Sequence, residues 1–197
     1  MNRTVKLSLL AIALLSTPVL ADETGKGSDT PNEATFRRQG ALLDRSPQKR
    51  NQMLSLFLGL PVGYFYYAGF PFGFGARYDI PILHDGFIPA INDSFHIEFG
   101  LDFSGVAGYR TFYPLLAIPV EVMWQFHMTQ KLGLYAKLGA ALEFSFISYC
   151  PTVGPCTGVV GGRPIGNVGL IYKFSEKLSF RAEVGYPWVK VGLGFDM

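Results

Sequence analysis

The sequence predicts an all-β fold, a closed up-and-down barrel of eight antiparallel strands that fills most of the 197-residue chain. Three observations predict it. Segments with apolar residues at every second position recur from residue 54 to the end, and a period of two is typical of strands with two unlike faces. No segment of helical periodicity separates them, so neighbouring strands are expected to pair as hairpins. Closing eight such strands into a barrel removes exposed sheet edges.

The first 21 residues are typical of a secretory signal peptide. Arg3 and Lys6 form a charged start, LSLLAIALL is the apolar middle, and VLA at 19–21 is a small-residue cleavage site. A helical membrane anchor fits less well, because the apolar run ends at STP, too early to span a bilayer. We therefore expect an exported protein with three parts: signal peptide 1–21, spacer 22–50 and barrel 51–197.

The spacer, residues 22–50, is rich in Gly, Ser, Asp, Asn, Pro and charged residues. Such a segment buries too little apolar surface to offset its ordering entropy, so we expect a polar, disordered spacer. EATFRRQGALL within it could form a short helix, and RSPQKR is a small basic run. A binding arm is the alternative interpretation of either stretch.

The first four expected strands alternate clearly. LSLFLGLPV at 54–62 has Leu or Val at every even position, and FPFGFGARYDIPI at 70–82 sets seven apolar residues against Pro, Gly, Arg and Asp. FHIEFGLDF at 95–103 alternates with His, Glu, Gly and Asp, and LAIPVEVMWQFH at 116–127 places Pro, Glu, Gln and His among its odd positions. Each segment therefore has one apolar and one mostly polar or glycine-rich face.

The last four expected strands repeat the pattern. LGLYAKLGAALEFSF at 132–146 is apolar at every even position, with Gly, Tyr, Lys, Ala, Glu and Ser between. NVGLIYKF at 167–174, LSFRAEVGY at 178–186 and WVKVGLGFD at 188–196 follow. Short links such as MTQ and SEK are turn-like, which supports hairpin connections.

Two opposite barrels fit this pattern: a soluble ligand-binding barrel with an apolar interior, and a membrane barrel with its apolar face in lipid. The polar face is crowded with Gly, which suits a narrow lumen, and its charges have mixed sign, so they can pair there. Aromatic residues gather near strand ends on the apolar face, as at bilayer interfaces. The interface aromatics we expect are Trp124, Phe126, Tyr172, Phe144 and Phe146.

In these features residues 51–197 resemble the small eight-stranded outer-membrane barrels of Gram-negative bacteria, the OmpA and OmpX type. The resemblance implies a transmembrane barrel in the bacterial outer membrane, with both barrel ends in the periplasm. It also implies contact with outer-membrane lipids and delivery by periplasmic chaperones to the barrel-assembly machinery. The chain departs from the family at its end, because Met197 stands where an aromatic residue is usual.

The strand phase also predicts cross-strand ion pairs in the lumen. Hairpin pairing across MTQ and across residues 186–187 places Glu121 opposite Lys137 and Glu183 opposite Lys190. Unpaired buried charge costs several kcal/mol, so pairing is expected of a stable barrel. These side chains would plug the lumen, which argues against a wide pore. A thin leak path is still compatible with the sequence. A bulge in either hairpin would shift the pairs.

The cysteines and histidines are the residues at which other chemistry could occur. Cys150 and Cys156 in an exported protein predict a disulfide that closes a short loop, because a metal site needs more ligands than that loop offers. His96 and His127 lie on the lumen face and are expected to be hydrogen-bonded lumen residues. Ser104 and Ser145 are candidates for an enzyme at the outer rim.

The sequence therefore predicts a non-enzymatic, monomeric outer-membrane protein with a structural, envelope or adhesion role and no cofactor. Near-neutral charge after residue 50, nine bases against ten acids, argues against nucleic acid as a partner. The alternatives are a narrow porin-like transport channel, a lipid-active or proteolytic enzyme, and the soluble barrel.

Overall fold

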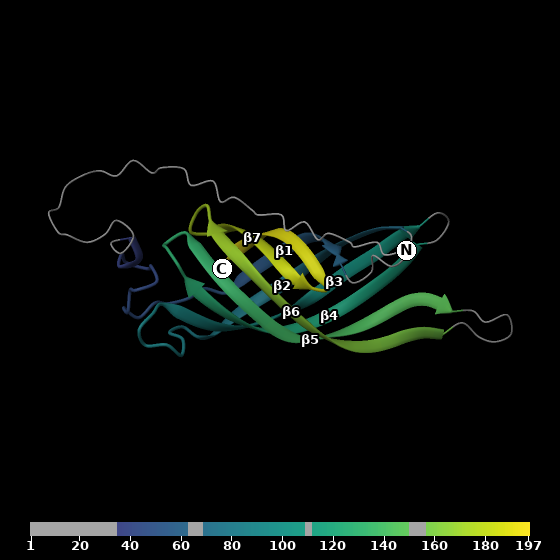
Figure 1. Ribbon diagram of the computed structural model, residues 1–197, viewed down its shortest axis with the longest axis horizontal. Coiled ribbons are helices and arrows are strands. Elements are labelled where there is room, and N and C mark those ends of the chain that lie inside the picture. Colours follow the sequence, from purple (N-terminus) through teal and green to yellow (C-terminus); the bar gives the residue numbers. More distant parts are fainter. Residues whose placement is uncertain (1–34, 63–68, 109–111, 150–156) are drawn as a thin grey trace, which may run out of the picture.

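The computed structural model describes residues 35–62, 69–108, 112–149 and 157–197. It is a closed barrel in which each strand pairs antiparallel with its neighbours in sequence and β1 also pairs with β8 (Figure 1). The eight predicted strands are confirmed. Their bounds are β1 Met53–Pro61, β2 Gly69–Leu83, β3 Asp93–Gly108, β4 Phe112–His127, β5 Leu132–Tyr149, β6 Thr157–Lys173, β7 Leu178–Tyr186 and β8 Trp188–Asp196.

The largest difference from the predicted strands is in β6, which begins at Thr157 rather than near residue 167. Its early half pairs with β5 alone, since its pairing with β7 starts only at Gly166. Gly162 and Pro164 occupy alternate positions there, so the apolar alternation that marks the other strands is missing. Proline is tolerated on a strand edge because its missing N–H is not needed for pairing there.

The barrel wall is uneven in height. β1, β7 and β8 have nine residues each, about the minimum for a tilted strand to cross a bilayer, whereas β2 to β6 have 15 to 18. The β5–β6 hairpin extends furthest, at the end away from the C-terminus (Figure 1). The barrel therefore has one long wall and one short wall.

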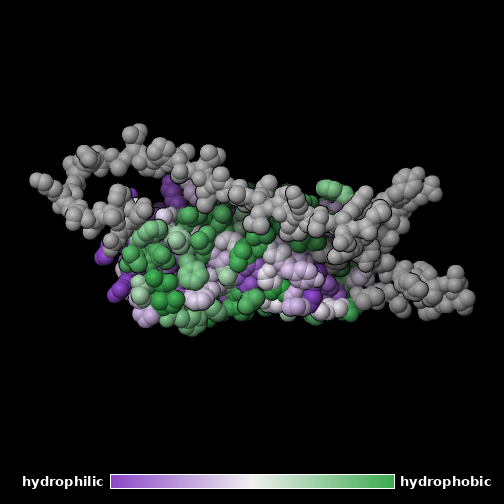
Figure 2. Space-filling model, viewed as in Figure 1, coloured by the Kyte–Doolittle hydropathy of each residue, from purple (hydrophilic) through white to green (hydrophobic). Residues whose placement is uncertain are grey.

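The apolar side chains at the even positions of β1 to β8 largely point away from the lumen. Leu134, Leu138, Val191 and Leu193 are exposed on the outside, Leu138 by 74%. Figure 2 shows apolar residues gathered on the barrel wall that faces the viewer. Charged residues at the alternate positions, such as Lys137, are buried inside. This arrangement is the reverse of a soluble barrel and matches the prediction of a lipid-facing wall. Among the described residues, no helix has the length and apolar character needed to cross a membrane.

The expectation of a disordered spacer is wrong for its second half. Residues 35–50 fold against the barrel end that carries the short turns and the C-terminus (Figure 1, purple). Ala41 is only 1% exposed, and the Leu42 carbonyl accepts a hydrogen bond of 2.7 Å from the Asn92 N–H. Main-chain contacts of this kind leave no hydropathy pattern, so composition alone did not reveal them. The signal peptide and residues 22–34 lie outside the described residues.

Candidate functional site

The lumen is filled by ionised side chains that the strand phase directs inward. Each is at most 4% exposed. Four are acids and four are bases, so their formal charges balance. They are Arg77 on β2, Glu98 and Asp102 on β3, Glu121 on β4, Lys137 on β5, Arg181 and Glu183 on β7, and Lys190 on β8.

Lys137 is surrounded by three carboxylates from three other strands. Its Nζ lies 2.7 Å from Glu98 Oε1, 2.9 Å from Glu183 Oε1 and 3.4 Å from Glu121 Oε2. An ammonium group has three donors, and here each is directed to an acid. Lys137 therefore connects β3, β4 and β7 across the lumen.

Arg181 and Lys190 supply further positive charge around the same acids. Arg181 Nη2 lies 2.8 Å from Glu98 Oε2 and 3.1 Å from Glu183 Oε1. The Lys190 Nζ lies 3.2 Å from Glu183 Oε2. The Arg181 guanidinium also stacks 5.0 Å from the Phe57 ring centroid, a favourable cation–π distance. Glu183 is thus held by three cations.

Arg77 extends the network towards the outer half of the barrel. It pairs with Asp102, and its Nε lies 3.5 Å from Glu121 Oε2 and 3.7 Å from Glu98 Oε1. Neutral donors complete the shell, since Asn167 Nδ2 donates to Glu121 over 2.8 Å and the Tyr135 hydroxyl donates to Glu183 over 2.8 Å. Several partners per ion compensate the cost of removing these charges from water.

Of the two predicted cross-strand ion pairs, one has the expected register and the other does not. Glu183 lies opposite Lys190 in the β7–β8 register, as expected. Glu121 instead lies opposite Gly139, and Lys137 opposite Met123, so the expected β4–β5 register is wrong by two residues. The reason is the turn: Thr129 Oγ1 accepts hydrogen bonds from the N–H groups of residues 131 and 132, which lengthens the loop. Glu121 and Lys137 still pair, diagonally.

Above the network, the outer half of the lumen holds apolar groups together with an ion pair in which Arg163 Nη2 lies 2.5 Å from Glu143 Oε1. The buried Trp188 ring reaches from β8 past β1 to Gly73 on β2, where a Cβ would run into it. Ala117, Ala141 and Ile165 form a small buried cluster at this level. Side chains therefore narrow the lumen above the charges, within the part of the chain that the structure describes.

Below the network, the histidines form a hydrogen-bonded chain that the sequence had not identified. Asp79 Oδ1 lies 2.7 Å from His96 Nδ1, and the Ser94 Oγ lies 2.8 Å from His96 Nε2 and 2.9 Å from His127 Nε2. Both His are therefore hydrogen-bonded lumen residues, as expected. The strand phase predicts that Asp79 faces the lumen, but not that Asp79 and Ser94 contact the histidines, because these contacts depend on the β2–β3–β4 register.

This chain borders a small polar cavity of about 80 Å³ at the barrel mouth. Glu98 lies two residues after His96 on the same face of β3, but it pairs with Lys137 and Arg181 rather than with His96. Ser104 is buried in the outer half of the lumen, and the structure brings no described His to it. No group of three or more His, Cys, Asp or Glu among the described residues could hold a metal ion.

The predicted interface aromatics lie at opposite ends of the wall. Trp124 and Phe126 stack with ring centroids 4.8 Å apart near the end of β4, and Tyr172 contacts Phe174 at 5.5 Å near the end of β6. Trp124 Nε1 donates to Asp93 over 2.7 Å. At the other end of the wall, Phe144 and Phe146 lie on β5, and Phe146 is 59% exposed. Their contact with lipid stays a prediction.

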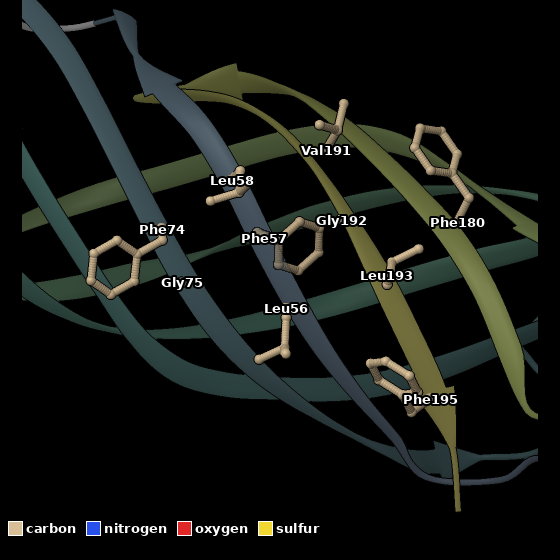
Figure 3. A pocket seen from close by; sticks show the side chains of 10 residues that line it. All are labelled: Leu56, Phe57, Leu58, Phe74, Gly75, Phe180, Val191, Gly192, Leu193 and Phe195. Atoms are coloured by element: carbon tan, nitrogen blue, oxygen red, sulfur yellow. The ribbon is translucent and has the colours of Figure 1, made fainter.

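The outer wall also carries a shallow apolar groove of about 500 Å³ across β1, β2, β7 and β8 (Figure 3). Leu56, Leu58, Phe74, Val191 and Leu193 line it with exposed side chains. Because the groove is continuous with the lipid-facing wall, ordinary acyl chains suffice to fill it.

The predicted disulfide cannot be placed, because Cys150 and Cys156 lie outside the described residues. It stays a prediction.

Comparison with solved structures supports the fold. Ail, the attachment invasion locus protein of Yersinia pestis, matches in two crystal structures with TM-scores of 0.52 and 0.50, at 15% identity over 76% of this chain and 100% of Ail. The N-terminal β-barrel domain of Pseudomonas aeruginosa OprF matches with a TM-score of 0.43, 17% identity and coverage of 76% and 100%. No protein-family profile and no curated protein matches the chain. The chain has the fold of the small eight-stranded outer-membrane β-barrels, the OmpA and OmpX type.

Proposed function

We propose that this protein is a non-enzymatic, integral outer-membrane barrel that supports the cell envelope and conducts no solute. The observation that carries the proposal is the balanced ion network in the lumen, in which Lys137 and Arg181 bind acids from several strands. Such a network ties opposite walls together, whereas a channel needs a continuous water-filled path. An exported chain with a cleaved signal peptide, inserted by the barrel-assembly machinery, fits this proposal.

An adhesive role is the second candidate, favoured by the uneven wall. Strands β3 to β6 extend beyond the β7–β8 turn at Pro187, so they would present a raised surface outside the membrane. Ail, which has the same fold, is named for attachment and invasion, and one of its structures contains the heparin analogue sucrose octasulfate. A comparable ligand for this chain is a proposal only.

The first experiment addresses location and conductance together. We expect the full-length protein in the outer-membrane fraction, with gel mobility that changes on heating, as a folded barrel shows. In planar bilayers it should give no conductance steps above background. Recovery from the periplasm without detergent would contradict the membrane assignment, and regular conductance steps would favour the transport channel.

The adhesive role has its own test. Cells that display the barrel should bind host cells or immobilised heparin more than cells that carry a variant with the tip of the β5–β6 hairpin shortened. Equal binding by both would remove adhesion and leave the structural role.

A further inference from the structure

Residues 36–50, here called the mouth strap, cross the open end of the barrel. The strap enters β1 at Met53, and at its other end the Gln39 carbonyl accepts a 2.9 Å hydrogen bond from Gln130 in the β4–β5 turn. β1 and β5 are four strands apart in either direction around an eight-stranded barrel. A segment anchored at both therefore spans the mouth rather than lying along its rim.

The centre of the strap is held by Asn92, just before β3. Its N–H donates to the Leu42 carbonyl over 2.7 Å, its Nδ2 donates to the Ala41 carbonyl over 3.2 Å, and its Oδ1 accepts from Arg50. One side chain thus fixes both the middle and the end of the strap. Ala41 is 1% exposed, so a charged side chain at this position would be buried.

Two further contacts attach the strap to the β2–β3 connection. The Gln48 N–H donates to Asp85 Oδ1 over 3.3 Å, and the Arg50 N–H donates to His84 Nδ1 over 3.1 Å. The strap also has internal order, because the Gly40 N–H donates to Asp44 Oδ2 over 2.6 Å while Gly40 takes φ of 75°, a conformation that glycine adopts without strain.

The last two residues of the strap, Lys49 and Arg50, line the polar cavity described above. Lys49, Arg50 and Asn51 form one side of the cavity, and Gln125 and His127 form another. The Asp79–His96–Ser94 chain lies along the same mouth. Detaching the strap would therefore remove one wall of this cavity.

Detaching the strap should cost less free energy than unfolding the barrel. Of the strap residues only Ala41 is fully buried, and Phe36 and Leu42 are half-buried. The hydrogen bonds that hold the strap join groups that can bond to water instead once it detaches. Segments with few buried apolar contacts and solvent-accessible hydrogen bonds open at lower free energy than the barrel around them.

We propose that the mouth strap is a releasable closure, and that its detachment opens the cavity beside Gln125 and His127 to the solution while the barrel stays folded. The inference does not depend on whether the proposed envelope role is correct, because it concerns access to one end of the lumen.

The test uses thiol accessibility in a full-length chain whose two natural cysteines are replaced by serine. Gln125→Cys reports on the cavity beneath the strap, and Ser104→Cys reports on the outer half of the lumen. Ala41→Glu releases the strap by forcing a charged side chain into a buried site. Leu43→Glu is the matched control, because it adds the same charge at a residue that is 38% exposed.

We expect maleimide to label the Gln125→Cys thiol about tenfold faster when Ala41→Glu is present. Leu43→Glu should not change that rate, and neither strap variant should change labelling of the Ser104→Cys thiol. Heat-modifiable gel mobility reports whether each barrel is folded. Deletion of residues 22–50 is the second release variant, because it also removes Lys49 and Arg50, the strap residues that line the cavity. It should give the same acceleration if Ala41→Glu does not fold.

Two results would overturn the proposal. Rapid labelling of the Gln125→Cys thiol with the strap intact would show that the strap does not close the mouth. Slow labelling in both the Ala41→Glu and the deletion variants, with the barrel folded, would show that the cavity is closed without the strap.

Discussion

The middle of the lumen and the mouth beneath the strap are both polar and buried, but they are held in different ways. In the middle, Lys137 and Arg181 bind carboxylates from several strands at 2.7 to 3.1 Å. At the mouth, the strap is held largely by single hydrogen bonds, many of them to main-chain carbonyls, around Asn92. Removing a partner from the first leaves unpaired buried charge, whereas removing one from the second admits water. Although both regions are buried, breaking a contact in the middle of the lumen should therefore cost more free energy than breaking one at the mouth.

The largest expected effect comes from breaking the middle. Lys137→Ala leaves Glu98, Glu121 and Glu183 short of a cation, and loss of one partner from a buried ion pair costs about 3–5 kcal/mol. We expect a loss of this size in the free energy of unfolding, measured by urea titration of the barrel in detergent or lipid. Lys131→Ala in the exposed turn is the control and should change it by less than about 0.5 kcal/mol. Equal stability of the two variants would mean that the network contributes little.

A smaller effect is expected between the two regions, at the histidine chain. Ser94→Ala removes the hydroxyl that joins His96 to His127 and leaves buried ring nitrogens without that partner. Leaving a buried polar group unsatisfied costs about 1–3 kcal/mol, so the same titration should show a loss below that of Lys137→Ala. A loss as large as that of Lys137→Ala would show that the mouth is as tightly built as the middle.

At the mouth itself, Asn92→Ala should detach the strap and leave the barrel intact. The variant removes the Nδ2 and Oδ1 contacts to Ala41 and Arg50. We expect amide hydrogens of residues 38–44 to exchange faster, with the free energy of barrel unfolding changed by less than about 1 kcal/mol. Asn51→Ala, at an exposed neighbour of β1, is the control and should leave exchange unchanged. Unaltered exchange in Asn92→Ala would remove Asn92 as the anchor.

The smallest effect concerns pH. The Gly40 N–H, and then Ser46, donate hydrogen bonds to Asp44 and hold the pKa of its carboxyl below the ordinary value of 3.8. A carboxyl whose pKa is lowered by folding stabilises the folded strap above its unfolded pKa, and this contribution disappears as pH falls through the lowered value. Amide exchange in the strap, corrected for intrinsic rates, should therefore rise below about pH 4 in the wild type. In Asp44→Asn the protection should be lower and independent of pH in this range; an unchanged acid dependence would assign it to another group.

Much of the barrel could be predicted from the sequence because its signal is local. Alternation gave the eight strands and the direction of residues such as Leu138 and Lys137, since a one-residue shift would reverse every side chain. It failed for the first half of β6, where Gly162 and Pro164 interrupt the apolar pattern.

The site was harder to predict because it depends on register. Phase alone placed Glu183 with Lys190, where the turn at residue 187 is tight, but missed the longer Thr129 turn that moves Lys137 away from its position opposite Glu121. The contact of Ser94 with His127 joins two strands, and the strap is fixed by main-chain groups. Neither leaves a periodic trace in the sequence.

The most direct test of the inverted barrel is spin labelling of successive residues from 132 to 142 on β5, in lipid bilayers. If the apolar face meets hydrocarbon, collision with oxygen, which dissolves in lipid, should alternate with a period of two and peak at even positions such as Leu138. The label at position 141, where the Ala side chain is buried and makes no ion pair, should be shielded from oxygen and from water-soluble nickel complexes alike. Peaks at odd positions, or access of nickel complexes to the even ones, would contradict a wall that faces lipid.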